Sequence, residues 1–190
     1  MRGVLLAALA AVGLSLAPAE TGWAQAVQTV QAAGSSPVTV VEHYYHALRG
    51  GQWGRAAAYV APEALDSLKE RLWRESQEDE RYRLPALRPA LESPAEYRRL
   101  PPTDVFRYLL SSIDAALPEW TAGIEAVEIS NLKVGDDGEA RVKVRIERRD
   151  ERGLLSRQSV TVRARRSHDG WRLLIPGDLP DLVARAGEGN

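Results

Sequence analysis

The sequence predicts an α+β fold in which helices cover one face of an antiparallel sheet. Apolar residues recur with the 3.6-residue period of helices between residues 36 and 117. The period changes to two between residues 127 and 175, where apolar and polar residues alternate as they do in half-buried strands. Helices followed by a run of strands are typical of α+β domains, because both kinds of element need a common core.

Three helices are predicted between Ser36 and Leu72. The first starts with Ser36 as N-cap and Pro37 at the first helical position, and it ends at Gly50 and Gly51. The inner lines of the three helices are Val41, Tyr44, Tyr45 and Leu48; Trp53, Ala56, Ala57 and Val60; and Leu65, Leu68 and Leu72.

Residues 75–102 form a charged insertion that prolines break into short pieces. Within it, Ser93 and Glu96 make a capping box, which predicts either a short helix through Arg99 or a turn. Thr103 is then predicted to cap a fourth helix that stops at Pro118. Its inner line is Phe106, Leu109, Leu110, Ile113 and Leu117.

Four strands follow in the predicted sheet. In the first, the apolar parity slips from Val127 and Ile129 to Leu132 and Val134, which predicts a bulge near Asn131. The next two strands alternate over residues 140–147 and 160–165, and the Asp169–Gly170 turn leads to a last inward row over residues 171–175. A short amphipathic turn over residues 179–183 ends a single domain at residues 36–184, and residues 185–190 are a polar tail.

The N-terminus predicts export. Arg2 supplies a positive start, residues 4–17 are apolar, and Ala24-Gln25-Ala26 is a small-x-small cleavage site. We therefore expect a signal peptide at residues 1–26, a flexible lead-in at 27–35, and a periplasmic or extracellular protein. The apolar run falls short of the roughly 20 residues of a membrane span, so no stable span is expected after processing; an uncleaved anchor is the alternative.

Composition excludes several kinds of site. The chain has no cysteine, which rules out disulfides, thiolate zinc sites and cysteine nucleophiles. Its net charge of -1 argues against a nucleic-acid binder. His43 and His46 stand three residues apart, a spacing that can hold a metal, but no third ligand is evident and solvent-exposed histidines are the plainer interpretation. No cofactor or metal is expected.

The segments VVEHYYHALRGGQWGRAAAYVAPEAL, GDDGEARVKVRIERR and HDGWRLLIP resemble the opening helices and closing strands of nuclear-transport-factor-2-like domains, which include ketosteroid isomerase. The resemblance covers about residues 36–68 and 126–175. It implies N-terminal helices packed in the concave face of a curved antiparallel sheet, giving a cone with a pocket at its open end.

In the isomerase branch, the resemblance assigns an oxyanion-hole tyrosine to Tyr44. The matching catalytic acid is missing, because residues 62–68 carry leucine where the acid would stand, and the inward rows of the strands are apolar. We therefore expect a non-catalytic binding or assembly module that holds a small apolar ligand in the cone. The alternative is an isomerase- or dehydratase-type enzyme that uses Tyr44.

Two sets of residues are candidate sites. The aromatic residues that could line a pocket mouth are Tyr44, Tyr59, Trp73 and Tyr108, although aromatic residues at helical spacing are more often plain core. The outward row of the sheet is basic and is predicted to bind a second copy or an acidic protein; an ordinary solvated face is the alternative. This row consists of Arg141, Lys143, Arg145, Arg163 and Arg165.

Overall fold

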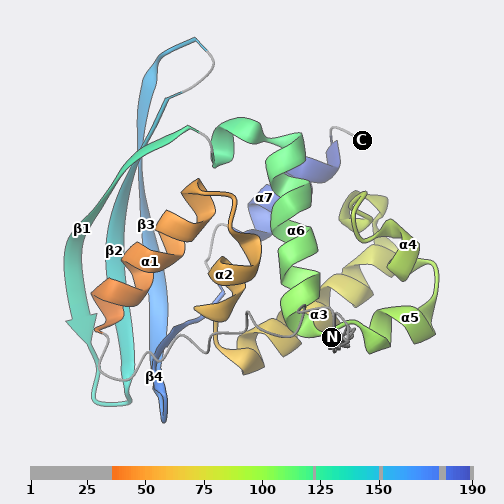
Figure 1. Cartoon of the computed structure of the whole chain (residues 1–190), viewed down its shortest axis with the longest axis horizontal. Coiled ribbons are helices and arrows are strands. Elements are labelled where there is room, and N and C mark those ends of the chain that lie inside the picture. Colours follow the sequence, from red (N-terminus) through yellow and green to blue (C-terminus); the bar gives the residue numbers. More distant parts are fainter. Residues whose placement is uncertain (1–35, 122, 150–151, 176–178, 189–190) are drawn as a thin grey trace, which may run out of the picture. The chain divides into compact units, whose positions relative to one another are not determined.

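The computed structural model describes residues 36–121, 123–149, 152–175 and 179–188 (Figure 1). It confirms the α+β class. The helical part consists of α1 (Pro37–Arg49), α2 (Trp53–Ala58), α3 (Pro62–Glu78), η1 (Glu80–Tyr82), α4 (Arg88–Leu91), α5 (Pro94–Arg99), α6 (Pro102–Ala116), η2 (Pro118–Trp120) and α7 (Leu179–Glu188). The strands are β1 (Ile124–Val134), β2 (Glu139–Arg149), β3 (Leu155–Ser167) and β4 (Gly170–Leu173). The predicted signal peptide and lead-in lie outside the described residues.

Side-chain caps start two of the α-helices, α1 and α5. The Ser36 hydroxyl accepts the Thr39 N–H at 3.1 Å, and the Ser93 hydroxyl accepts the Glu96 N–H at 3.4 Å, so α1 and α5 begin as predicted. The prediction that Thr103 caps α6 is wrong. This helix begins at Pro102, whose fixed φ and missing N–H suit the first helical position, and no side chain caps it.

The four strands form an antiparallel sheet in the order β1-β2-β3-β4. The register shifts between Ile129 and Asn131, which confirms the predicted bulge. One face of β2 and β3 is buried against the helices and carries the inward residues Ala140, Val142, Val144, Ile146, Val162 and Ala164. The other face, called the outer face below, is polar and exposed.

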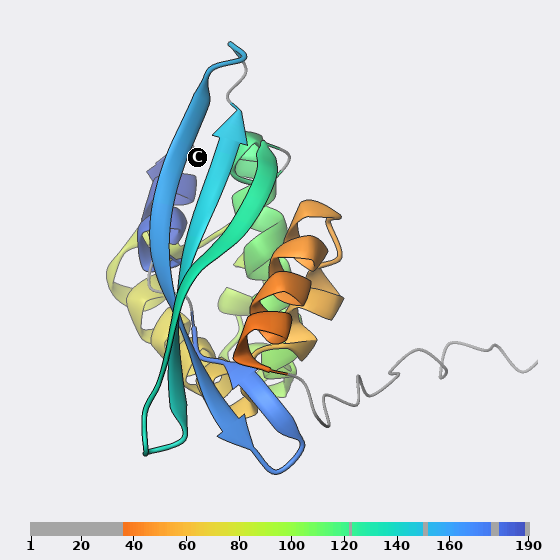
Figure 2. The same cartoon turned by 90° about the vertical axis from the view of Figure 1, so that its left-hand side faces the viewer.

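α1 contacts all four strands on the inner face of the sheet, and α6 packs behind it against α2, α3 and α7. The helices gather on one side of the sheet in Figure 1, and Figure 2 shows β1, β2 and β3 in front of them. Tyr44, Leu48 and Phe106 are among the largest fully buried side chains between these layers. Among the described residues, no helix combines the length and the apolar character that a membrane crossing requires.

The two edges of the sheet differ. At β4, residues 59–61 lie alongside the strand: Leu173 donates its N–H to the Tyr59 carbonyl, and its own carbonyl accepts the Ala61 N–H, both at 2.8 Å. Val60 and Leu173 thereby form a parallel bridge that covers this edge at the end of β4. β1 is the terminal strand on the opposite side of the described sheet.

The C-terminus differs from its prediction. A turn over residues 179–183 followed by a tail was expected, whereas α7 continues to Glu188. Ala186 is fully buried, and Gly187 lies so close to η1 that a Cβ built on it would be 2.0 Å from the Arg81 carbonyl oxygen. Two consecutive small residues allow this close approach of helix and backbone, so the packed domain extends past residue 184.

Candidate functional site

The four predicted ligand-binding aromatic residues lie in different surroundings. Tyr44 and Tyr59 are buried in the core, and the Tyr44 ring meets Tyr45 edge-on at 5.4 Å between centroids. Tyr108 lies on α6 with the Arg107 guanidinium 4.9 Å from its ring centre. Trp73, on α3, lines a surface groove of about 810 Å³. The structure therefore does not bring these four residues to one pocket mouth, and ligand binding stays a prediction.

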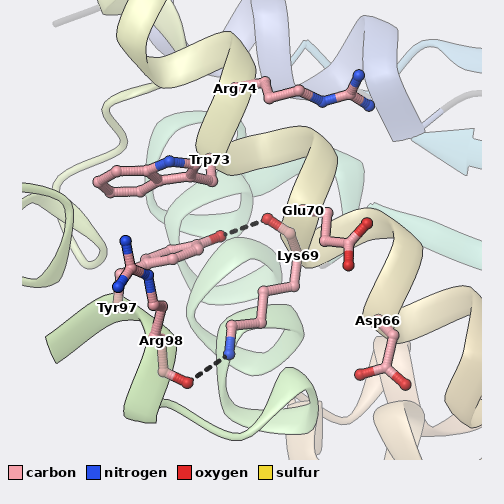
Figure 3. Close-up of a pocket in the computed structure, with 7 residues that line it drawn as sticks. All are labelled: Asp66, Lys69, Glu70, Trp73, Arg74, Tyr97 and Arg98. Atoms are coloured by element: carbon pink, nitrogen blue, oxygen red, sulfur yellow. Dashed lines mark hydrogen bonds between the residues drawn. The ribbon is translucent and has the colours of Figure 1, made fainter. Parts of the chain in front are cut away.

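The groove beside Trp73 lies between α3 and α5 (Figure 3). The rings of Trp73 and Tyr97 are 5.1 Å apart, and the Tyr97 hydroxyl donates to the Lys69 carbonyl at 2.8 Å. The Lys69 ammonium in turn donates to the carbonyls of Arg98 and Leu100, at 3.0 and 2.6 Å. Burial raises the pKa of Tyr97. These polar groups already bond one another across the two helices, so they fasten the proline-broken insertion to α3.

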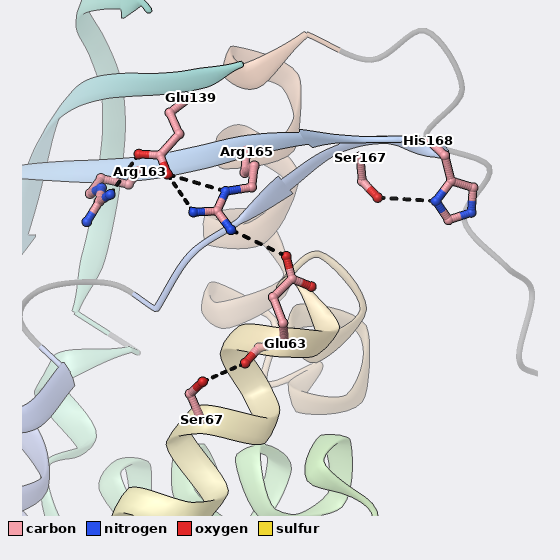
Figure 4. Close-up of polar contacts among 7 residues, drawn as sticks. All are labelled: Glu63, Ser67, Glu139, Arg163, Arg165, Ser167 and His168. Carbon is pink, nitrogen blue, oxygen red and sulfur yellow. Dashed lines mark hydrogen bonds and ion pairs between the residues drawn. The ribbon is translucent and has the colours of Figure 1, made fainter. Parts of the chain in front are cut away.

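All five residues of the predicted interface are exposed on the outer face, on β2 and β3. Three of them have carboxylate partners. Arg145 lies 3.3 Å from Glu128, and Arg163 and Arg165 each lie 2.7 Å from Glu139 (Figure 4). Arg165 also approaches Glu63, in the first turn of α3, at 3.9 Å. The basic row is thus partly neutralised by glutamates on the same face, and which cation each glutamate pairs with depends on the register between strands.

A row of cations crosses the sheet on the outer face. Lys133 on β1 pairs in register with Arg141 on β2, and Arg141 pairs with Arg163 on β3. Lys133 and Arg141 make no ion pair with any residue that the structure describes, and the same holds for Lys143. Like charges directly opposite on neighbouring strands destabilise a sheet. This arrangement therefore carries a cost that an anionic partner would relieve.

Acidic side chains also border this row. Lys133 and Arg141 share a small hollow of about 240 Å³ with Asp137 and Glu139. The Asp137 carboxylate accepts the Glu139 N–H at 3.0 Å, and the Glu139 carboxylate is held by Arg163 and Arg165. Both carboxylates are thus hydrogen-bonded, Asp137 within the turn and Glu139 within the cross-strand cluster. Lys133 and Arg141 face outward and have no such partner in the described part of the chain.

Arg163, followed by Arg165, hydrogen-bonds the ionised form of Glu139 and holds the pKa of that carboxyl at about 2, below its ordinary 4.5. A carboxylate with a lowered folded-state pKa stabilises the fold above its ordinary pKa, and this contribution disappears as the pH falls through the folded value. Glu139→Gln should therefore lower the thermal midpoint by a few degrees at neutral pH. The difference from the parent should shrink between pH 4.5 and 2.

Thermal unfolding of both proteins in steps between neutral pH and pH 2 measures this difference. The matched control is Glu92→Gln, which changes an exposed carboxylate without an ion pair among the described residues. A difference between parent and Glu139→Gln that stays constant down to pH 2 would show that the cluster with Arg163 and Arg165 does not supply the effect.

Sequence reasoning missed Lys133 as a member of the outer row. The parity slip that predicted the bulge also turns Lys133 outward, so the signal was present in the sequence. Pairing between Glu139 and Arg165 could not be predicted in the same way, because it depends on the register of β2 against β3. The described residues contain no group of three potential metal ligands, and His43 instead lies with its ring 5.8 Å from that of Tyr59.

Comparison with known proteins gives no relative: no family model, curated protein or solved structure matches this chain. The resemblance to nuclear-transport-factor-2-like domains therefore stays a prediction that rests on the residues quoted above.

Proposed function

We propose that this protein is a non-catalytic, exported binding module that holds an acidic protein partner on the outer face of its sheet. The observation that carries the proposal is the row of Lys133, Arg141 and Arg163, in which cations stand directly opposite one another on three strands. A partner carboxylate placed over this row would relieve the repulsion between neighbouring cations. Association would then be driven by charge complementarity at an exposed face.

An acidic partner fits this face better than a face-to-face pair of identical sheets. In such a pair, Arg141 and Lys143 of one copy would approach the same basic row of the other. Like-charge juxtaposition across an interface disfavours association. A nucleic-acid partner has less support, since the outward positions of β2 and β3 carry no aromatic side chains on which bases could stack.

The enzyme alternative has weaker support. Tyr44 is 1% exposed, and the residues of the inner sheet face from Ala140 to Ile146 are aliphatic and fully buried. Aliphatic side chains cannot transfer protons, whereas acid–base chemistry needs a positioned ionisable group within hydrogen-bond reach of a substrate. A binding role requires no such group, and it makes use of the exposed charges that the outer face provides.

The test is the double variant Arg141→Glu with Lys143→Glu, which reverses two cations that have no described ion-pair partner. Poly-L-glutamate serves as the acidic polypeptide probe, and binding is measured by titration at low salt. We expect the parent to bind, and the double variant to bind at least about tenfold more weakly, because each exposed charge contact contributes up to about 1 kcal/mol. Added salt should weaken parent binding, since exposed charges are screened over about 10 Å at 0.1 M.

The matched control is Arg55→Glu with Arg99→Glu, which changes the net charge equally but lies on α2 and α5. It should bind nearly as well as the parent. Equal losses in both double variants would reduce the effect to net charge and contradict a specific face. A parent that fails to bind the acidic probe at low salt would also contradict the proposal.

A further inference from the structure

β1, at the edge of the sheet, carries two apolar side chains that are exposed to solvent. Leu132 and Val134 are 39% and 55% exposed. They face the same side as Val142 and Ala140, their partners in the register, yet the helices do not cover them. An exposed edge strand with alternating apolar side chains is a template for pairing with another strand. At the opposite edge, residues 59–61 cover β4 at Leu173.

The bulge gives β1 a symmetric arrangement of side chains. In residues 127–134, VEISNLKV, the register places Val127, Ile129, Leu132 and Val134 toward the inner face. Glu128 and Lys133 face outward, opposite Arg145 and Arg141 on β2. Without the bulge, residues 129 and 132 would point to opposite faces, because side chains alternate along a regular strand. Because of the bulge, each residue of 127–129 has an apolar or charged counterpart among residues 132–134 that points to the same face.

This symmetry makes β1 complementary to itself. If a second β1 runs antiparallel with the two-fold axis between Ser130 and Asn131, Glu128 lies opposite Lys133 of the second copy. In the same register, Ile129 lies opposite Leu132 and Val127 opposite Val134 of the second copy, all toward the inner face. The two-fold axis repeats each pair, so the contact holds two opposite-charge pairs and four apolar pairs. Opposite charges and apolar residues directly across from one another are the pairs that stabilise antiparallel strands.

We propose that two copies of this chain associate through β1 in this register and form one continuous sheet across the dimer. Lys133, which has no ion-pair partner among the described residues of its own chain, is then paired with Glu128 of the second copy. Glu128 still reaches Arg145 of its own chain through one carboxylate oxygen. Leu132 and Val134 lose their exposure to water. A closed two-fold contact of this kind uses the same patch on both subunits.

The dimer shares Lys133 with the row proposed to bind an acidic partner, but it does not use the two residues changed in that test. Its contacts come from the edge of β1, whereas Arg141 and Lys143 on β2 stay on the outer face, away from the edge. Pairing through β1 would place the two outer faces side by side in one sheet. The Arg141→Glu with Lys143→Glu variant should therefore lose the acidic probe and remain dimeric. Failure of one proposal can thus be recognised without failure of the other.

Charge reversal at Glu128 or at Lys133 tests the dimer. Sedimentation equilibrium over a range of protein concentrations measures its dissociation. Glu128→Lys puts lysines opposite each other at both symmetric positions, and Lys133→Glu does the same with glutamates. Each single variant should dissociate at least about tenfold more readily than the parent, because two attractions become repulsions. An equimolar mixture of the two variants should recover parental affinity, since each lysine then faces a glutamate.

Recovery of dimerisation in the mixture distinguishes pairing between two copies from effects of the substitutions within one chain. Glu128→Lys loses the contact with Arg145, and Lys133→Glu gains a carboxylate opposite Arg141, but neither change depends on the other variant's presence. The double variant Glu128→Lys with Lys133→Glu should also dimerise, because the charges are exchanged on both strands. Arg99→Glu, an exposed reversal on α5, is the control and should leave the dissociation constant unchanged.

The register itself can be mapped with thiols, because the chain has no cysteine of its own. Copies with Glu128→Cys mixed with copies with Lys133→Cys should form a disulfide-linked pair under mild oxidation, since opposite Cα atoms in antiparallel strands lie about 4.5–5.5 Å apart. Glu128→Cys mixed with Val134→Cys should link far more slowly. A parent that is monomeric at every concentration would overturn the proposal, as would a mixture of charge-reversed variants that stays dissociated.

Discussion

Replacing Tyr97 with alanine is expected to lower the free energy of unfolding by about 3–5 kcal/mol, the range for truncating a large buried aromatic side chain. Tyr97 is 2% exposed although it lies in the charged, proline-broken insertion. Its ring stacks on Trp73, and its hydroxyl bonds the Lys69 carbonyl. The alanine variant removes both contacts and leaves a cavity between α3 and α5. Urea unfolding followed by circular dichroism measures the loss.

Tyr97→Phe is the matched control, because it keeps the ring and removes only the hydroxyl. It should cost about 0.5–1.5 kcal/mol, the usual net contribution of one hydrogen bond. If the two variants proved equally unstable, the hydroxyl rather than the ring would hold the insertion against α3. If both were as stable as the parent, the insertion would not contribute to the cooperative unfolding of the domain.

Gly187→Ala is expected to destabilise the protein by about 1–3 kcal/mol, as overpacking does. The added Cβ would lie 2.0 Å from the Arg81 carbonyl oxygen and 2.8 Å from the Arg81 Cα, which are backbone atoms that cannot rotate away. α7 would have to move away from η1, and this would loosen the buried side chains of Leu182, Val183 and Ala186. Thermal and urea unfolding measure the change.

The control is Gly54→Ala in α2, where a Cβ meets nothing within 4 Å. Alanine is a better helix former than glycine by about 1 kcal/mol, so this variant should be as stable as the parent or more stable. The two substitutions are chemically identical and differ only in their surroundings. A Gly187→Ala protein as stable as Gly54→Ala would mean that α7 does not pack against η1 in solution.

Much of the fold could be predicted because periodicity and capping are local signals. The helix of Pro37–Arg49 and the bulge between Ile129 and Asn131 followed from neighbouring residues. The start of α6 was misplaced by two positions because both Thr103 and Pro102 are residues typical of helix starts, and the proline took the first helical position, with Pro101 as N-cap. The last turns of α7 were missed although Ala186 continues the i, i+3, i+4, i+7 line of Leu179, Leu182 and Val183, because an alanine followed by glycine is a weak apolar signal. The contact of Gly187 with η1 depends on tertiary packing.

The candidate site was predictable in part for the same reason. Alternation along β2 and β3 showed that Arg141 and Arg163 point outward, and the structure confirms this exposure. The pairing of cations with glutamates depends on register between strands, which alternation does not determine. Pocket residues depend still more on tertiary placement: Tyr59 and Trp73 were both predicted to line one pocket mouth, but Tyr59 is buried and Trp73 borders a groove.

The bridge between Val60 and Leu173 has a consequence for how the chain folds. The segment that covers the β4 edge comes early in the sequence, whereas β4 is the last strand, so this edge cannot form until nearly the whole chain has been synthesised. Contacts between distant parts of a sequence slow folding, because a large loop must close before they form. The core around the N-terminal helices is therefore complete only after the C-terminal strand has been added. For a chain proposed to cross a membrane by way of a signal peptide, such a delay keeps it unfolded for longer before translocation.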